Sequence, residues 1–154
     1  MSPSRRSPTV GELQTWRTFI EVAEDLRAAM SRRLQEDSGL STGDYGVLLA
    51  LSERPAQSIR SSELADDIGW ERSRLSHHLG RMEKRGLIAR EDCATDNRGA
   101  EIVLTPTGAD AFRRSSGPHL HAIREQFVDA LTPAQLAALD DAAAALRAHL
   151  GAVD

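Results

Sequence analysis

Residues 61–90 read SSELADDIGWERSRLSHHLGRMEKRGLIAR. Counted from Ser61, alanine stands fifth (Ala65), glycine ninth (Gly69) and leucine fifteenth (Leu75). A small residue lets two helices cross closely, glycine permits the left-handed turn between them, and an aliphatic residue fixes the second helix on the first. The spacing predicts a helix-turn-helix whose first helix is capped by Ser61 and ended by Gly69, with the start of the second helix free to enter a DNA major groove. Two ordinary packed helices share this spacing, so plain packing is an alternative at this point.

A β-hairpin is predicted directly after these helices. Short strands are expected at 87–90 and 101–104, the second because apolar Ile102 and Leu104 stand two positions apart. The polar segment 92–100 between the strands is longer than a tight turn requires, so it predicts a loop that projects from the hairpin.

Long helices are predicted before this middle part. Apolar residues recur at steps of three and four from Leu13 to Leu34, which is one face of a helix. A second, more uniformly apolar helix is expected to begin at Ser41 or Thr42, where Ser41 and Asp44 have the spacing of a capping box.

Two more helices are predicted after the hairpin. The Thr-Pro pair at 105–106 is typical of a helix start, and the Gly-Pro pair at 117–118 is expected to kink or break this helix. A second capping box stands at 132–135. The leucines of segment 136–150 then form the apolar stripe of a last helix.

Composition bounds the class of protein. The 154 residues are 40% hydrophobic and 27% charged, which fits one globular domain. No apolar stretch approaches about 18 residues, so no transmembrane helix is predicted. Residues 1–9 are polar and lack the apolar segment of a signal peptide, so they are expected to be a flexible arm. Cys93 is the only cysteine, which excludes an intramolecular disulfide, and the cytoplasm is the expected compartment.

Charge is unevenly distributed along the chain. The net charge is −4, but residues 70–98 hold seven basic and five acidic side chains. This segment is therefore positive, and the rest of the chain is acidic. A basic patch on an acidic body is typical of DNA-binding proteins, although a run of charge also occurs on any solvated helix face.

Four segments together resemble the MarR family of transcriptional regulators. Residues 62–69 are similar to the first helix of the family's helix-turn-helix, and residues 81–88 to the end of its recognition helix. The Asp-Asn-Arg-Gly run at 96–99 resembles the family's wing-tip signature, and the run at 104–108 its return into helix. The resemblance covers about residues 10–150. It implies a dimer built from the first and the last two helices, and a wing arginine that enters a minor groove.

The resemblance also implies a fold class and a function. The expected fold is mainly α with a small β-hairpin wing, as one compact domain. Residues 41–105 would form the winged helix-turn-helix lobe, and residues 10–40 and 106–154 the dimerisation helices. The implied protein is a sequence-specific DNA-binding regulator, expected to be a repressor. It would bind a pseudo-palindromic operator as a homodimer and be released by a small-molecule ligand.

Two other classes of protein, a protein–protein contact module and an enzyme, compete with this function. A winged helix that serves only protein–protein contacts is the alternative, although such a module needs no cationic reading surface. An enzyme is not expected, because the sequence contains no glycine-rich phosphate loop, no metalloprotease pair and no nucleophile elbow.

The expected contacts to double-stranded DNA lie on the second helix of the motif and in the projecting loop. Arginine reads guanine, and serine and histidine bond bases or phosphates. Asp96 is expected to support the wing by a salt bridge, because DNA would repel its carboxylate. His78 faces inward and is expected to be half-buried with a local hydrogen bond. The predicted DNA contacts are Ser61, Arg72, Ser73, Arg74, Ser76, His77 and Arg98.

Trp16, Tyr45 and Phe112 are candidates for a pocket that binds a small aromatic or anionic effector, as family members commonly do. Each is also a candidate for plain core. Cys93 lies at the base of the wing, away from the place where redox-sensing family members carry their reactive cysteine. The remaining histidines do not form a convincing metal set, because His119 and His121, two apart, face different ways on a helix. No metal and no cofactor is predicted.

Overall fold

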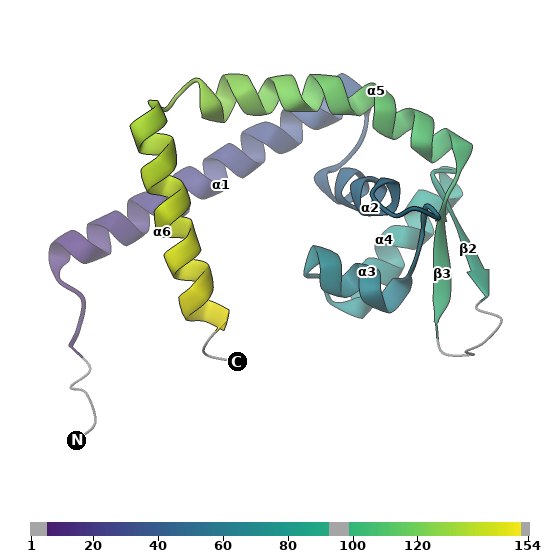
Figure 1. Ribbon diagram of the computed structural model, residues 1–154, viewed down its shortest axis with the longest axis horizontal. Coiled ribbons are helices and arrows are strands. Elements are labelled where there is room, and N and C mark those ends of the chain that lie inside the picture. Colours follow the sequence, from purple (N-terminus) through teal and green to yellow (C-terminus); the bar gives the residue numbers. More distant parts are fainter. Residues whose placement is uncertain (1–5, 93–98, 152–154) are drawn as a thin grey trace. The chain divides into compact units, whose positions relative to one another are not determined.

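The computed structural model describes residues 6–92 and 99–151. Helices dominate this part of the chain and three short strands form one sheet, so the fold is mainly α with a β wing, as predicted. By internal contacts the chain divides into two compact units: unit 1 is residues 1–30 and 122–154, and unit 2 is residues 31–121. The elements are α1 (Val10–Ser38), α2 (Thr42–Ser52), β1 (Ser58–Arg60), α3 (Ser61–Ile68), α4 (Arg72–Lys84), β2 (Ile88–Asp92), β3 (Ala100–Leu104), α5 (Pro106–Ile123), the π-helical turn η1 (Arg124–Val128) and α6 (Pro133–Gly151) (Figure 1).

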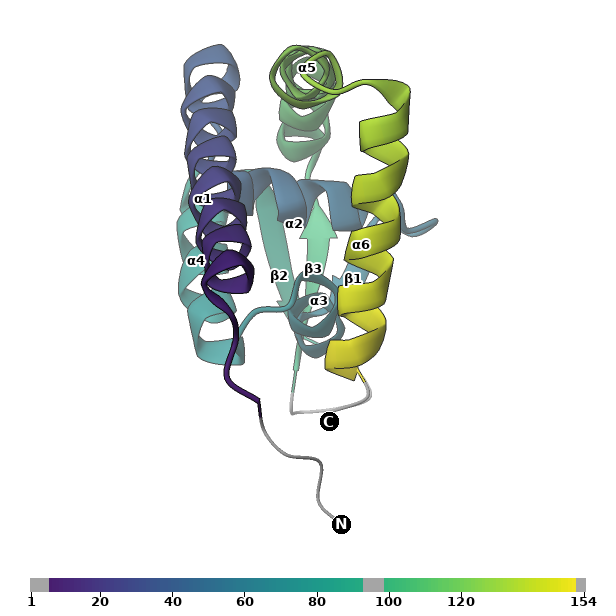
Figure 2. The same cartoon turned by 90° about the vertical axis from the view of Figure 1, so that its left-hand side faces the viewer.

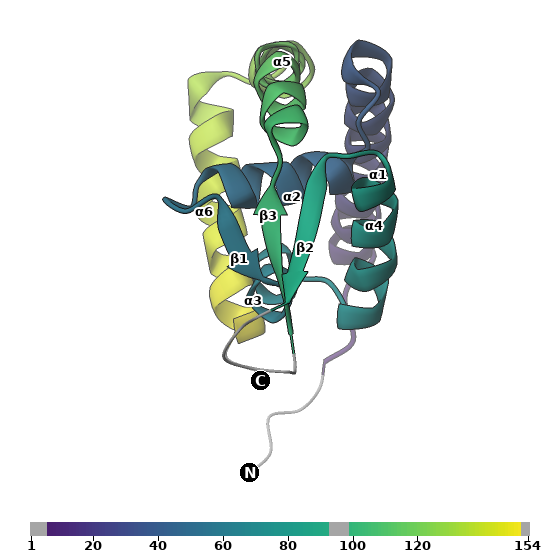
Figure 3. The ribbon, with the colours of Figure 1, turned by 90° about the vertical axis from the view of Figure 1, so that its right-hand side faces the viewer.

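The sheet belongs to unit 2 and has the strand order β1-β3-β2, with both pairs antiparallel (Figure 3). β2 and β3 form the predicted hairpin, in which Ile88 lies opposite Leu104. β1 pairs with the other side of β3, so that Ile59 lies opposite Ile102. The sequence pattern does not predict β1, because Ile59 is the one apolar residue among its three positions.

The core of unit 2 lies between this sheet and helices α2, α3 and α4 (Figure 3). The predicted apolar stripe of α4 is confirmed, since Leu75, Leu79 and Met82 are each at most 1% exposed. Burial of these side chains fixes which face of α4 points inward. The other large, fully buried side chains include Leu48, Leu51, Leu64, Ile88 and Ile102.

The start of α2 confirms the predicted capping box. Ser41 Oγ accepts a hydrogen bond from Asp44 N at 3.0 Å, and Asp44 Oδ2 accepts one from Ser41 N at 3.0 Å. Thr105 caps α5 in a similar way, because its Oγ1 accepts a hydrogen bond from Gly108 N at 3.0 Å. Side-chain oxygens thus satisfy backbone donors that the first helical turn leaves unpaired.

The prediction that Ser61 caps α3 is wrong. β1 runs directly into α3, so Arg60 takes the N-cap position with extended backbone, and no side chain makes a capping hydrogen bond there. The end of α3 agrees with the prediction. Gly69 has a φ of +67°, a left-handed conformation that glycine adopts without steric cost.

Of the predicted kink or break at Gly117-Pro118, the break is wrong. α5 contains Pro118 and continues to Ile123, where η1 follows directly. Proline cannot bond the carbonyl four residues earlier, which is that of Arg114. Because Arg114 and Pro118 are both exposed, water can satisfy this carbonyl and the helix continues.

Unit 1 exposes much of its apolar surface. The predicted capping box of α6 is present, since Gln135 N donates to Thr132 Oγ1 at 3.2 Å and Thr132 N to Gln135 Oε1 at 2.9 Å. α6 is a continuous helix (Figure 2), and none of its residues is buried. The exposed large apolar side chains of the described part of unit 1 are Val10, Leu13, Trp16, Phe19, Val22, Leu139, Leu146 and Leu150.

Candidate nucleic-acid interface

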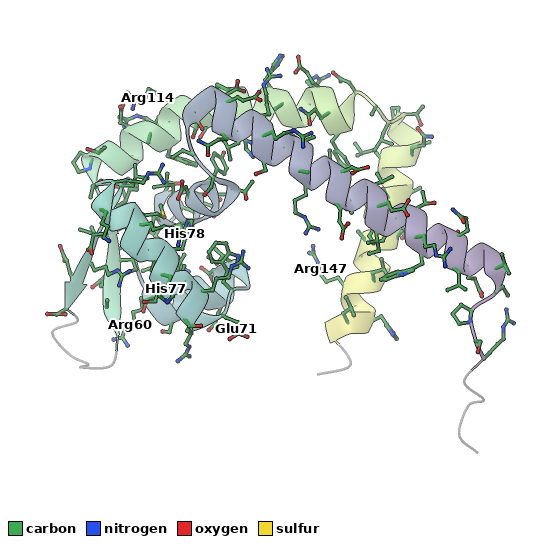
Figure 4. All side chains as sticks on the ribbon, turned by 180° about the vertical axis from the view of Figure 1, so that it is seen from behind. Arg60, Glu71, His77, His78, Arg114 and Arg147 are labelled. Carbon is green, nitrogen blue, oxygen red and sulfur yellow. The ribbon has the colours of Figure 1, made fainter. Side chains whose placement is uncertain are left out.

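The side of α4 that faces away from the core is polar and basic. His77 and His78 are neighbours on this helix (Figure 4), yet His77 is exposed and His78 is only 7% exposed. The first two turns therefore offer guanidinium, hydroxyl and imidazole groups to solvent. Five of the predicted DNA contacts share this exposed position: Arg72, Ser73, Arg74, Ser76 and His77.

The turn between α3 and α4 is held by its own backbone. Gly69 N donates to Asp66 O at 3.3 Å, and Trp70 N donates to Ala65 O at 2.9 Å. These two hydrogen bonds are those of a Schellman motif, which ends a helix with a defined change of direction. The turn therefore fixes the place at which α4 begins.

The indole of Trp70 lies beside the exposed face of α4. The guanidinium carbon of Arg74 lies 4.0 Å from the centroid of the Trp70 ring, which is within the range of a cation–π contact. His78 meets the indole edge-on, with ring centroids 5.1 Å apart and ring planes at 81°. The sequence predicts that Arg74 is exposed but does not predict Trp70 as its partner.

His78 is buried, and its main polar partner is distant in sequence. The expectation of a half-buried side chain with a local hydrogen bond is therefore only partly right. Arg81, one turn away, donates from Nη2 to His78 Nδ1 at 3.2 Å, and His78 Nε2 lies 3.0 Å from Asp44 Oδ1. A guanidinium only donates, so Nδ1 is the acceptor and Nε2 carries the proton. Burial lowers the pKa of His78 and outweighs the attraction of Asp44, so the ring is neutral at pH 7.

Asp44 ties the start of α2 to α4. Its carboxylate is buried, and Arg85 Nη1 donates to Asp44 Oδ2 at 2.6 Å. Burial alone raises the pKa of this carboxyl, but the hydrogen bonds from Arg85 and from the Ser41 backbone lower it by more, so the net shift of the pKa is downward. The charged carboxylate at the start of α2 therefore holds α4 in place through His78 within the helix and through Arg85 at its end.

A hollow of about 260 Å³ opens between the start of α3, one flank of α4 and the sheet. Ser61, Arg72 and Ser76 line it, so three of the predicted DNA contacts come together there. Arg90 of β2 also lines it and donates from Nη2 to Ser76 O at 2.6 Å. Arg90 is absent from the predicted contacts because its position on a strand gave no sign that it faces α4.

The strands of the hairpin lead toward the predicted wing tip and are described as far as Asp92 and from Ala100 onward. Asp96, Arg98 and Cys93 lie outside the described residues. The roles expected for Arg98 and Asp96 stay predictions.

Two of the three candidate effector residues lie together in unit 2. The rings of Tyr45 and Phe112 are 5.3 Å apart, and the ring of His119 is 4.4 Å from that of Tyr45. Burial lowers the pKa of His119. Trp16 belongs to unit 1 and is 60% exposed. The effector pocket itself stays a prediction.

Two searches of the described residues bear on other kinds of site. Among residues 6–92 and 99–151, no cluster of three or more His, Cys, Asp or Glu side chains is arranged to hold a metal ion. No helix within the same residues combines the length and apolarity that crossing a membrane requires.

Comparison with known proteins gives matches along almost the whole chain. The MarR family model matches residues 38–99. The crystal structure of AbsC, a MarR family transcriptional regulator from Streptomyces coelicolor, is 37% identical, with 96% of this chain and 99% of that chain covered and a TM-score of 0.87. The structure of Sco3205 from the same organism, solved in complex with DNA, is 38% identical over 95% of this chain and 91% of that chain, with a TM-score of 0.88.

Curated sequences give shorter matches. The transcriptional repressor MprA of Escherichia coli K12 is 28% identical over 100 residues, which are 65% of this chain and 56% of MprA. The matched segment spans about half the length of the first curated relatives.

The evidence for the family combines sequence identity, coverage and fold. This chain and AbsC share more than 30% of their residues over almost the full length of both chains. The fold described above has the helix-turn-helix and the hairpin of a winged helix, with long helices before and after them in the chain. The chain belongs to the MarR family of transcriptional regulators.

Proposed function

We propose that this protein is a sequence-specific DNA-binding repressor that binds a pseudo-palindromic operator as a homodimer. The observation that carries the proposal is the face of α4, whose apolar side is buried while its arginines, serines and His77 are exposed. A helix held in this way can enter a major groove with its polar side forward. The DNA complex of Sco3205, at 38% identity, supports this proposal.

The proposed contacts divide into base reading and phosphate binding. Arg74 stands on the exposed side of the first turn and reads a guanine edge, because arginine donates two parallel hydrogen bonds to guanine. Ser61, Arg72 and Ser76 line the hollow beside α4 and bind backbone phosphates. Ser73 and His77 complete the groove-facing set. Arg98, in the wing, enters the adjacent minor groove.

The homodimer forms through unit 1. Helices α1 and α6 expose large apolar side chains that a single chain does not cover, among them Trp16, Phe19 and Leu146. A second copy would bury them, because apolar surface of this extent on a soluble protein marks an interaction site. Two-fold symmetry then presents two copies of α4 to half-sites about one helical turn apart.

A small aromatic or anionic effector releases the repressor from DNA. The aromatic pair Tyr45 and Phe112 of unit 2 is the proposed binding site. The repressor role is supported by the name of the relative MprA.

A gel-shift titration tests DNA binding. The probe is a duplex that the wild-type protein enriches from a random-sequence pool, and binding is expected to weaken steeply with salt because cationic contacts release counterions. Arg74→Ala should cost about 1–3 kcal/mol and relax base preference at one position.

Arg114→Ala is the matched control. Arg114 is an exposed arginine on α5 and lies at the end of unit 2 away from Arg60, Glu71 and His77 (Figure 4). The Arg114→Ala substitution should leave the affinity for the enriched duplex unchanged. Failure of the wild type to enrich any duplex, or salt-independent binding, would favour a module that serves only protein contacts.

A further inference from the structure

Trp70 occupies a fixed place between the core and the exposed face of α4. Its backbone is held by the Schellman hydrogen bond from Trp70 N to Ala65 O at 2.9 Å. It stands two residues before the first residue of α4, so its side chain is anchored from outside the helix that it touches.

The inner side of the indole packs closely against α2. A Cβ atom at Gly43 of α2 would lie 2.7 Å from Trp70 Cη2, so that only a glycine fits there. His78 meets the ring edge-on and is itself held 3.0 Å from the buried carboxylate of Asp44. The inner side of the indole is therefore packed against α2 and His78.

The outer side of the indole carries Arg74, whose guanidinium carbon lies 4.0 Å from the ring centroid. A guanidinium that covers an aromatic ring keeps its N–H donors along its edges, where they can still bond a carbonyl or a ring nitrogen of a base. A long arginine side chain otherwise loses many rotamers on binding, which lowers affinity. The contact with Trp70 restricts these rotamers before DNA arrives.

We propose that Trp70 is a positioning residue for DNA recognition, which holds the guanidinium of Arg74 in the orientation that reads a base. The inference rests on the proposed function, since it assigns Trp70 a role in the base contact of Arg74. Trp70 acts through Arg74 and need not touch DNA.

A double-mutant cycle tests this role. The affinity for the duplex enriched by the wild type is measured for the wild type, Trp70→Leu, Arg74→Ala and the double variant, with melting temperatures as the check on folding. Trp70→Leu should weaken binding about two- to fivefold, the effect of losing one exposed cation–π contact, and should broaden base preference at the position that Arg74 reads. In the Arg74→Ala background, Trp70→Leu should leave the affinity unchanged.

Trp70→Phe keeps an aromatic face and is expected to retain part of the affinity and base preference. It also serves as the second variant for the cycle if Trp70→Leu does not fold. A role limited to fold stability would lower affinity equally with and without Arg74, and that result would overturn the inference.

Two further outcomes have distinct meanings. Binding by Trp70→Leu as tight as the wild type would show that Trp70 takes no part in recognition, and tighter binding would show that Trp70 holds Arg74 back. Either result would overturn the inference alone. A wild type that enriches no duplex at all would overturn the proposed function and the inference together.

Discussion

Asp44 and His78 join two helices through a polar contact within an apolar core. Burial lowers the pKa of His78 from 6.5, so the folded protein binds this proton less readily than the unfolded chain. The stability that the neutral ring contributes is complete above pH 6.5 and is lost as the pH falls through the lower pKa of the folded state. Although burial raises the pKa of Asp44, its hydrogen bonds with Arg85 and Ser41 lower it below 3.8, so the same sign applies there in a more acidic range.

His78→Gln should remove the first of these two effects. The free energy of unfolding should be about 1 kcal/mol lower than that of the wild type at neutral pH, because a polar contact in the core is lost. It should then decline less between about pH 7 and pH 5 than the wild type does. Urea unfolding at a series of pH values measures both quantities.

His77→Gln is the matched control for this series. His77 is the next residue on α4 but is exposed, so its replacement removes an imidazole from the same helix without removing a buried contact. His119, whose pKa burial also lowers, should contribute to the acid sensitivity that remains in His78→Gln. A decline in His78→Gln as steep as that of the wild type would assign the effect elsewhere.

Sequence reasoning at the residue scale succeeds where neighbours on one helix decide the outcome. The spacing of Leu75, Leu79 and Met82 determines which face of α4 is buried, and therefore which polar residues are exposed. The tie between Asp44 and Arg85 joins residues 41 positions apart. No local pattern encodes such a pair, because it depends on how α2 and α4 pack.

At the scale of elements, α2 carries two glycines in different surroundings. A methyl group at Gly43 would lie 2.7 Å from Trp70 Cη2 and 3.0 Å from His78 Cε1, whereas a methyl group at Gly46 would meet nothing within 4 Å. Gly43 lies in the first turn of the helix and Gly46 in its interior, so alanine gains helix propensity mainly at Gly46.

Gly43→Ala should therefore lower the free energy of unfolding by about 1–3 kcal/mol, because the added methyl group overpacks the contact between α2 and Trp70. Gly46→Ala should leave it unchanged or raise it by up to about 1 kcal/mol. Chemical denaturation of both variants gives the comparison. Equal stability of the two would mean that the indole has free space beside α2.

Helix ends are predictable when side chains make the caps, as at Ser41 with Asp44 and at Thr132 with Gln135. Ser61 has the residue type of a cap but lies inside α3, because β1 extends to Arg60 and takes the cap position. β1 itself forms through its partner β3, and a segment of three residues has too short a pattern to predict that pairing.

At the scale of the whole molecule, the apolar faces of α1 and α6 determine assembly. Leu146 is 51% exposed in the single chain, so its burial in the proposed dimer would contribute about 0.8–1.5 kcal/mol per copy. Leu146→Glu should therefore raise the dimer dissociation constant at least about tenfold. Analytical ultracentrifugation at micromolar concentrations measures the change.

Arg147→Gln is the control, because Arg147 is the next residue of α6 and is also exposed (Figure 4). It should leave the association unchanged. A wild type that remains a folded monomer at these concentrations would contradict the proposed dimer.

The small sheet of unit 2 joins segments at very different distances along the chain. β2 and β3 are adjacent in sequence, whereas Ile59 of β1 pairs with Ile102 only after the chain has passed through α3 and α4. Closing the longer loop costs more chain entropy, so we expect β1 to pair with β3 after the hairpin has formed. The hydrogen bond from Leu104 N to Gln57 O, at 2.9 Å, would form in that later step. The edge strand would then act as a clasp, added to a hairpin and helices that are already in place.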